Sequence, residues 1–199
     1  MATGKVETLT SDRELILQLQ EGSLNALGEL YDRHQLLVYR TALAITGDPE
    51  AAGDLLQDVF LRVHRFADRI DPERPLEPWL YRTTMNLTYT WVKRYNRLIR
   101  PLEDIAHWFT AGKKQSPPDL TEKEEEYEDI RRAISRLDLS HRIVVVLYYI
   151  NDLSIQEISE IIDIPVGTVK SRLFYGRQVL KQQLETKGFD LREVQYEFT

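Results

Sequence analysis

Residues 153–180 constrain the fold of this chain more than any other stretch, because they predict two short helices joined by a tight turn. Ser154 and Glu157 have the S-x-x-E spacing of a capping box, in which a hydroxyl and a carboxylate satisfy the free amides of a helix start. The isoleucines that follow recur at helical spacing. Pro165 interrupts that pattern, because proline has a fixed φ and no N–H to donate. The pattern is typical of a helix-turn-helix.

The second helix of this pair has an apolar inner face, formed by Val166, Val169, Leu173 and Leu180. Between residues 165 and 184 there are four positive side chains and no negative one, in a chain whose net charge is −6. A cationic outer face suits insertion into the major groove of DNA, where Lys and Arg meet phosphates and smaller polar or aromatic side chains reach base edges. A helical hairpin with a solvated basic face is the competing interpretation. The candidate DNA contacts are Thr168, Lys170, Ser171, Arg172, Phe174, Tyr175 and Arg177.

The composition narrows the class of protein. The chain of 199 residues contains no cysteine, which excludes disulfides and thiolate metal sites and fits a reducing cytosol. The first residues lack the apolar segment of a secretory signal. The longest apolar run, residues 143–150, is far too short for a membrane span of about 20 residues. These observations lead us to expect a cytoplasmic, globular protein that binds nucleic acid through a local patch.

Helix start and stop signals predict several helices within residues 10–100, which together form a first helical domain. Ser11 with Glu14 is a second capping box, Ser23 is a helix cap, and Asp48 before a proline is a preferred start pair. Gly22 and Gly47 mark helix ends. A loop rich in proline precedes a further helix, expected over residues 79–96, that ends in a basic run. A wide apolar stripe is expected at Ala52, Leu55, Leu56, Val59, Phe60, Val63 and Phe66.

The composition changes after residue 100. Residues 101–121 read as a flexible linker, and residues 122–186 as a second helical domain that begins with many carboxylates. Ser140 is expected to cap an almost entirely apolar helix at residues 143–150. Residues 187–199 form a C-terminal tail. The fold class predicted for the whole chain is all-α, with two small helical domains joined by a flexible linker and no alternating strand pattern.

Three stretches of the sequence resemble motifs of a known protein family. The run IPVGTVKSRLFYGRQVL resembles the promoter-reading helix of bacterial extracytoplasmic-function (ECF) sigma factors, the smallest class of sigma subunits of RNA polymerase. The stretch DPEAAGDLLQDVFLRVHRF is similar to the family pattern D-x-E-D-x-x-Q-[ED]-x-F-[LI]. A third stretch, PLEPWLYRTTMNLTYTWVKR, is similar to P-F-x-x-W-L-Y-R-I-A-x-N-x-x-x-D-x-x-R. The first domain resembles the family over nearly all of residues 29–97.

The resemblance implies a surface that grips the clamp helices of the large polymerase subunit. Periodicity agrees, because the implied residues lie off the apolar stripe of their helix. Gly53 departs from the family pattern, which usually has an acidic residue there, and glycine inside a helix costs roughly 1 kcal/mol relative to alanine. The implied core polymerase contacts are Asp54, Gln57, Asp58, Leu61 and Arg62.

The resemblance also implies contacts to the minus-ten promoter element. In the family, a loop of the first domain holds an unstacked base of the melted strand, and contacts in the pocket return the few kcal/mol that flipping costs. In this chain that loop supplies Asp68, Arg69, Asp71 and Arg74. The helix after it ends in cations that suit a DNA backbone. Its candidate contacts are Arg82, Asn86, Lys93, Arg94 and Arg97.

As a sigma factor the chain would bind core RNA polymerase and promoter DNA, melt the minus-ten element with the first domain and read the minus-thirty-five element with the second. The family also implies an anti-sigma partner, often membrane-anchored. Catalytic residues, metals, cofactors and a small-molecule substrate are not expected, since the four histidines are scattered and no phosphate-binding glycine loop occurs. The alternatives are a stand-alone helix-turn-helix transcriptional regulator and a protein that serves only as an interaction module.

Overall fold

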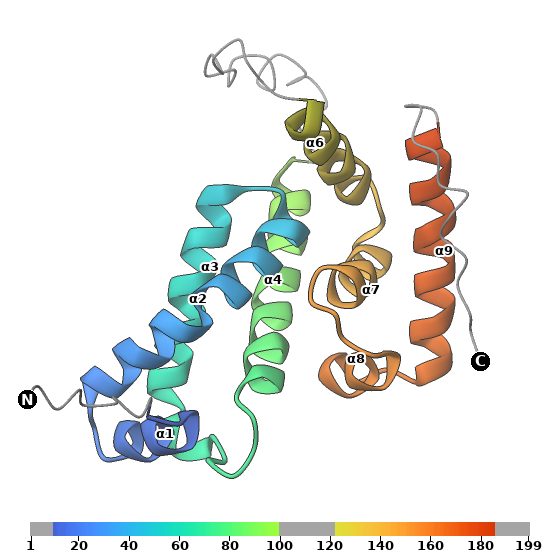
Figure 1. Cartoon of the computed structure of the whole chain (residues 1–199). Coiled ribbons are helices and arrows are strands. Elements are labelled where there is room, and N and C mark those ends of the chain that lie inside the picture. Colours follow the sequence, from blue (N-terminus) through green and yellow to red (C-terminus); the bar gives the residue numbers. More distant parts are fainter. Residues whose placement is uncertain (1–9, 100–121, 186–199) are drawn as a thin grey trace, which may run out of the picture.

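The chain folds into two helical bundles that lie side by side (Figure 1). The computed structural model describes residues 10–99 and 122–185, with side chains for 10–95 and 129–185. All regular structure in these ranges is helical, which confirms the all-α fold class. The predicted linker, 101–121, and the predicted tail, 187–199, lie outside the described residues. The N-terminal bundle comprises α1 (Asp12–Gln20), α2 (Leu24–Thr46), α3 (Pro49–Arg65), the 3₁₀ turn η1 (Ala67–Arg69) and α4 (Glu77–Ile99). The C-terminal bundle comprises α6 (Glu122–Ser135), α7 (Leu139–Tyr149), α8 (Ile155–Ile162) and α9 (Val166–Glu185).

The start and stop signals of the N-terminal bundle are confirmed. Ser11 and Glu14 form a complete capping box, in which each side chain accepts a hydrogen bond from the backbone N–H of the other residue. The carboxylate of Asp48 accepts from the first turn of α3. Gly47 ends α2 with φ of 71°, a left-handed conformation that glycine adopts without strain. Local side-chain chemistry therefore fixes where these helices begin and end.

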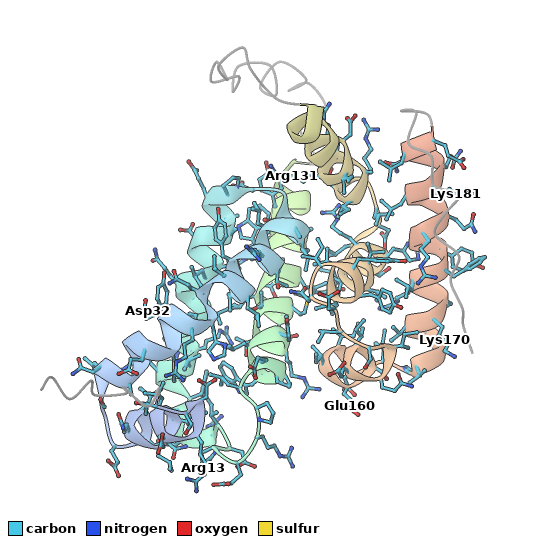
Figure 2. The ribbon with its side chains drawn as sticks, in the orientation of Figure 1. Arg13, Asp32, Arg131, Glu160, Lys170 and Lys181 are labelled. Carbon is cyan, nitrogen blue, oxygen red and sulfur yellow. The ribbon has the colours of Figure 1, made fainter. Side chains whose placement is uncertain are left out.

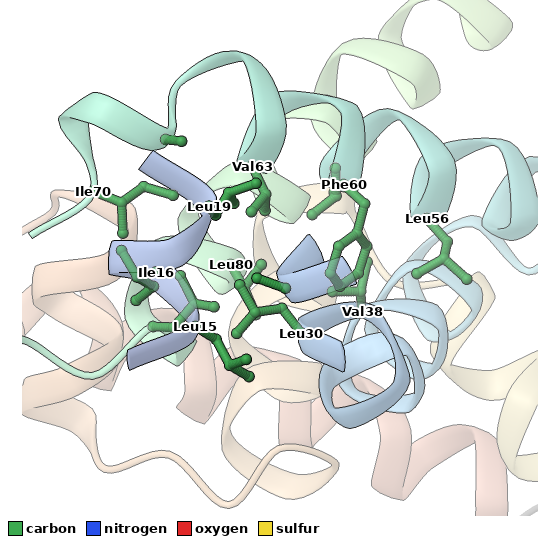
Figure 3. Close-up of a cluster of buried hydrophobic side chains, with 14 residues drawn as sticks. Leu15, Ile16, Leu19, Leu30, Val38, Leu56, Phe60, Val63, Ile70 and Leu80 are labelled. Atoms are coloured by element: carbon green, nitrogen blue, oxygen red, sulfur yellow. The ribbon is translucent and has the colours of Figure 1, made fainter. Parts of the chain in front are cut away.

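The N-terminal core forms where α1 lies across the end of α2 and α3 (Figure 3). Leu15 and Ile16 of α1 are completely buried, as are Leu30 of α2 and Leu80 of α4. The ring of Phe60 meets Tyr31 edge to face, with 4.9 Å between the ring centroids. The apolar stripe of α3 is buried as expected, except that Phe66 is half-buried. The opposite face of α3 is consequently left to solvent.

Three local expectations differ from the structure. The cap of α7 is Asp138 rather than Ser140, because the Asp138 carboxylate accepts from both the amide and the hydroxyl of Ser140 and starts the helix earlier. Helix α4 begins at Glu77, before the expected residue 79, since proline in the first helical turn needs no N–H partner. Val166 was expected on the inner face of α9 but is 37% exposed, because it is the first residue of the helix and no preceding turn covers it.

The C-terminal bundle is built on α7, whose residues Ile143 to Leu147 are all buried. Helix α9 packs against α7 at Gly176, which is itself buried. A Cβ atom at this position would lie 2.8 Å from Cγ2 of Val145 and 3.6 Å from Cβ of His141. The missing side chain of Gly176 thus allows the two helices to approach closely.

Two glycine substitutions should have opposite effects on stability. Gly176→Ala should lower the free energy of unfolding by about 1 kcal/mol, because overpacking against Val145 costs more than the gain in helix propensity. Gly53→Ala should raise it by about 0.5 to 1 kcal/mol, because its Cβ would meet no atom within 4 Å. Urea unfolding followed by circular dichroism measures both. Stabilisation by both substitutions would show that α7 and α9 do not approach so closely.

Candidate nucleic-acid interface

Helices α8 and α9 form the helix-turn-helix. Hydrogen bonds from the side chain and backbone of Ser154 hold the pKa of Glu157 below its usual range, as expected for the capping box at the start of α8. Asp163 ends α8 in the left-handed region, with φ of 54°. The Ser159 hydroxyl donates to the carbonyl of Ile164 at 2.6 Å, which closes the turn. These bonds fix the angle at which α9 leaves the turn.

The outer face of α9 carries a cation and two aromatic rings side by side. Lys170 and Ser171 are exposed near the start of the helix, and Lys170 points away from the body of the protein (Figure 2). Phe174 is 51% and Tyr175 is 58% exposed, with their ring centroids 5.5 Å apart. Two large aromatic side chains exposed next to each other indicate a binding surface. The structure therefore brings four of the seven predicted minus-thirty-five contacts together.

The other three predicted contacts flank this face. Arg177 is half-buried, and its guanidinium lies over the rings of Tyr148 and Tyr149 at 5.6 and 5.5 Å from their centroids. Arg172 is half-buried beside a cavity of about 580 Å³ that opens between α4 and the helix-turn-helix. Thr168 is half-buried in the first turn of α9. These positions suit contacts at the edge of a groove rather than at its centre.

The solvent face of α3 displays all five predicted polymerase contacts. Asp54, Gln57, Asp58 and Arg62 are exposed, and Leu61 between them is 63% exposed. The spacing of these residues gives one continuous patch, because helix positions three and four apart are neighbours. An exposed leucine inside a charged surface is a common feature of the centre of a protein interface.

The loop predicted to hold a melted base runs from η1 to the start of α4. Asp68 and Arg69 are exposed, and the Arg69 guanidinium lies 5.3 Å from the centroid of the Phe66 ring. Asp71 and Arg74 pair with each other at 3.3 Å. The structure thus brings the four predicted loop residues to one end of the N-terminal bundle.

Sequence reasoning missed the residue that anchors this loop. The Gln20 side chain donates to the carbonyl of Ala67 at 3.0 Å and to that of Ile70 at 2.9 Å. Arg13 pairs with Glu73 at 2.7 Å on the outer side. Gln20 lies at the end of α1, about fifty residues before its partners in the sequence. No local sequence motif predicts these two hydrogen bonds. A bridge of this kind depends on the packed position of α1.

Helix α4 contributes the remaining predicted minus-ten residues, of which some are exposed to solvent and one is bonded to the other bundle. Asn86, Lys93 and Arg94 are exposed, and the Lys93 ammonium lies 4.4 Å from the centroid of the Tyr89 ring. Arg82 is engaged by the other bundle, since its guanidinium donates to two backbone carbonyls at the end of α8. Arg97 lies on α4, but its side chain is outside the described set.

Comparison with known proteins identifies a family domain in each bundle. The family model for sigma-70 region 2 matches residues 30–98, and the model for sigma-70 region 4 matches residues 127–180. The ECF RNA polymerase sigma factor SigW of Bacillus subtilis is 30% identical over 179 residues, which cover 86% of this chain and 96% of SigW. The chain belongs to the ECF sigma factors. The ECF RNA polymerase sigma-E factor of Escherichia coli K12 is 28% identical over 187 residues, or 90% of this chain and 96% of the relative.

Solved structures show the same fold. CnrH, in its complex with the cytosolic domain of CnrY, aligns with a TM-score of 0.63 at 24% identity, over 88% of this chain and 97% of CnrH. The sigma factor RpoE of Bartonella quintana, in complex with the anti-sigma factor NepR, aligns with a TM-score of 0.64 at 18% identity, over 79% of this chain and 96% of RpoE. The family models identify the N-terminal bundle of this ECF sigma factor as the region 2 domain and the C-terminal bundle as the region 4 domain.

A cluster of polar side chains inside region 2 is explained without a ligand. Ligand atoms of Asp12, His34 and Glu77 lie within 4.8 Å of one another. The carboxylate of Asp12 is already occupied, by Nε2 of the buried His34 at 2.6 Å and by the Arg33 guanidinium at 2.9 Å. The cluster fixes α1 against α2 in this ECF sigma factor. Among the described residues, no helix is long and apolar enough to cross a membrane.

Proposed function

We propose that this ECF sigma factor binds core RNA polymerase through the solvent face of α3 and reads promoter DNA with surfaces on both bundles. The observation that carries the proposal is the different chemistry of two exposed helix faces. The face of α3 presents carboxylates around Leu61, which suits a protein partner. The face of α9 presents cations and aromatic rings, which suit DNA.

At the minus-thirty-five element, α9 would enter the major groove with its N-terminal half, as recognition helices do. Lys170 would meet a backbone phosphate. Ser171, Phe174 and Tyr175 would face base edges, where a hydroxyl can donate or accept and a ring can contact a thymine methyl group. Thr168, Arg172 and Arg177 would contact the strands at the groove edges. Arg177 would reach a strand only after turning away from the two tyrosines of α7, because Nε and Nη2 of its guanidinium are buried.

At the minus-ten element, the loop held by Gln20 would receive an unstacked base. Asp68 and Asp71 can accept hydrogen bonds from a base edge, and Arg69 and Arg74 can bind the neighbouring phosphates. Asn86, Lys93, Arg94 and Arg97 would continue the path along α4. Arg82 would join them only after leaving its partners in region 4.

The remaining partners follow from this role. The sigma factors CnrH and RpoE were solved with CnrY and NepR bound, and their fold is the one found here, which supports an anti-sigma partner for this chain as well. The protein would act in the bacterial cytoplasm, where the polymerase transcribes DNA. It would be a non-catalytic initiation factor, with the chemistry of RNA synthesis left to the polymerase. We propose domain limits of 10–100 for region 2 and 122–186 for region 4.

Run-off transcription with bacterial core polymerase on a library of promoter fragments tests the function. Specific transcripts should appear only when the sigma factor is present. The double substitution Gln57→Ala with Asp58→Ala should reduce them by about tenfold or more, because the few residues that dominate binding cluster near the centre of an interface and cost about 2 kcal/mol or more when truncated.

The matched control is the pair Asp32→Ala with Gln35→Ala on α2, which removes the same functional groups outside the α3 surface. It should leave transcript levels unchanged. Absence of transcripts together with sequence-specific DNA binding by the protein alone would instead identify a stand-alone regulator.

The salt dependence of promoter binding tests Lys170. Lys170→Ala should weaken binding of the polymerase complex to every promoter and make the slope of log K against log salt shallower by about 0.9, because one fewer counterion is released. The control Arg40→Ala removes an exposed cation of α2, away from both DNA surfaces, and should leave the slope unchanged. An unchanged slope for Lys170→Ala would remove its phosphate contact.

A further inference from the structure

A cavity of about 580 Å³ lies between α4 and α8, which run beside each other (Figure 1). The start of α7 and one residue of α9 complete its walls. Small-molecule sites in proteins typically occupy about 300 to 1,000 Å³ and are common between domains. The polymerase and promoter contacts proposed above assign this cavity no ligand. Its lining residues indicate which class of compound it would bind.

The inner wall of the cavity is aliphatic. Met85 of α4, Ile143 of α7 and Ile161 of α8 line it, and each is less than a tenth exposed. Among the described residues of the lining, Tyr89 is the one aromatic side chain, so no pair of rings is available to enclose a nucleobase. Burial of apolar surface against such a wall is favourable. The wall therefore suits the aliphatic body of a ligand.

An arginine without a protein acceptor lines the same cavity. Arg172 of α9 is half-buried, and no hydrogen bond or ion pair joins it to another described residue. Polar groups removed from water are normally hydrogen-bonded, and partial burial strengthens the attraction between opposite charges. A guanidinium is a rigid fork that can bind a carboxylate or a phosphate through two parallel hydrogen bonds. Arg172 can thus hold an anionic group.

A second arginine of the lining is fixed in position. Nε and Nη2 of Arg82 donate to the carbonyls of Ile161 and Glu160, both at 3.0 Å. These bonds leave Nη1 as a further donor. Asn86, one turn along α4, adds an exposed amide. Asp163 is the single acidic side chain among the described lining residues, so the two cations give the cavity a net positive charge.

We propose that this cavity is a binding site for a small amphipathic anion, a compound with a carboxylate or phosphate head and an aliphatic body. The head would pair with Arg172, and the positive charge of Arg82 would add to the attraction. The body would lie against Met85, Ile143 and Ile161. An occupant that holds Arg172 would compete with the minus-thirty-five contact proposed for that residue. The competition rests on the function proposed above, whereas the binding site does not.

Methyl NMR of the free full-length chain tests the site. The chain has two methionines, Met1 and Met85, and the second lines the cavity, so methyl-labelled methionine reports on its wall. Titration with octanoate should move the Met85 signal saturably. 1-Octanol has the same number of carbons and no charge, and it should bind at least about tenfold more weakly because it cannot pair with a guanidinium. Octyl phosphate, titrated in the same way, shows which of the two anionic heads is preferred.

A charge-removing variant tests the role of Arg172. Arg172→Gln keeps a polar side chain and should weaken octanoate binding about tenfold or more, while 1-octanol binding stays within about twofold. A purely structural defect would weaken both. The matched control Arg40→Gln removes an exposed cation of α2 and should leave both affinities unchanged. If circular dichroism shows Arg172→Gln to be unfolded, the comparison of octanoate with 1-octanol on the wild-type chain decides the case.

Run-off transcription tests the competition. Octanoate should reduce specific transcripts over the concentration range in which it moves the Met85 signal, and 1-octanol at equal concentration should not.

An unmoved Met85 signal, equal affinity for octanoate and 1-octanol, or an unchanged octanoate affinity in Arg172→Gln would overturn the binding site. Saturable octanoate binding with no loss of transcripts would overturn the competition. A chain that binds octanoate as expected but yields no specific transcripts with core polymerase would contradict the proposed function and support the binding site.

Discussion

Helix α7 is the element on which the rest of the structure depends, because residues 143–147 along it are all buried. A helix without a solvent face has to be covered on every side. Helix α9 covers one side through the close approach at Gly176, and α2 and α8 cover others. The same helix therefore holds the DNA-reading helix in place and draws region 2 against region 4. The apolar residues of α7 therefore support both the position of the DNA-reading helix α9 and the packing of region 2 against region 4.

The parts of the fold that depend on neighbours in sequence were predictable. The boxes at Ser11 and Ser154 are confirmed, and the stop at Gly47 is confirmed, because each involves residues within one helical turn. The predicted cap of α7 was wrong for a local reason as well, because Asp138 and Ser140 lie two residues apart and both carry a capping oxygen, and the carboxylate of Asp138 caps the helix. Periodicity also predicted which face of α3 and of α9 would meet solvent.

The parts that depend on distant segments were not predictable from a single chain. Arg82 has the same place in the sequence motif whether it faces DNA or the carbonyl of Ile161, and only the packed structure distinguishes the two. Arg142 reads as an ordinary helix cation, yet it reaches the carbonyl of Ile45, almost one hundred residues earlier. Gln20 likewise supports the minus-ten loop through carbonyls about fifty residues away. Every residue has a backbone carbonyl, so the sequence does not indicate which carbonyl a distant side chain will contact. Only the folded structure identifies these hydrogen bonds.

The central claim is that the two bundles contact different promoter elements. Site-specific photo-crosslinking from the proposed DNA-binding surface of each bundle, in the complex with core polymerase and one promoter, tests this claim most directly. A crosslinking amino acid at Tyr175 should react with bases of the minus-thirty-five element, and one at Arg69 with the melted strand of the minus-ten element, about 25 base pairs downstream. Crosslinks from both positions to one element, or none from Arg69 to the melted strand, would contradict the account.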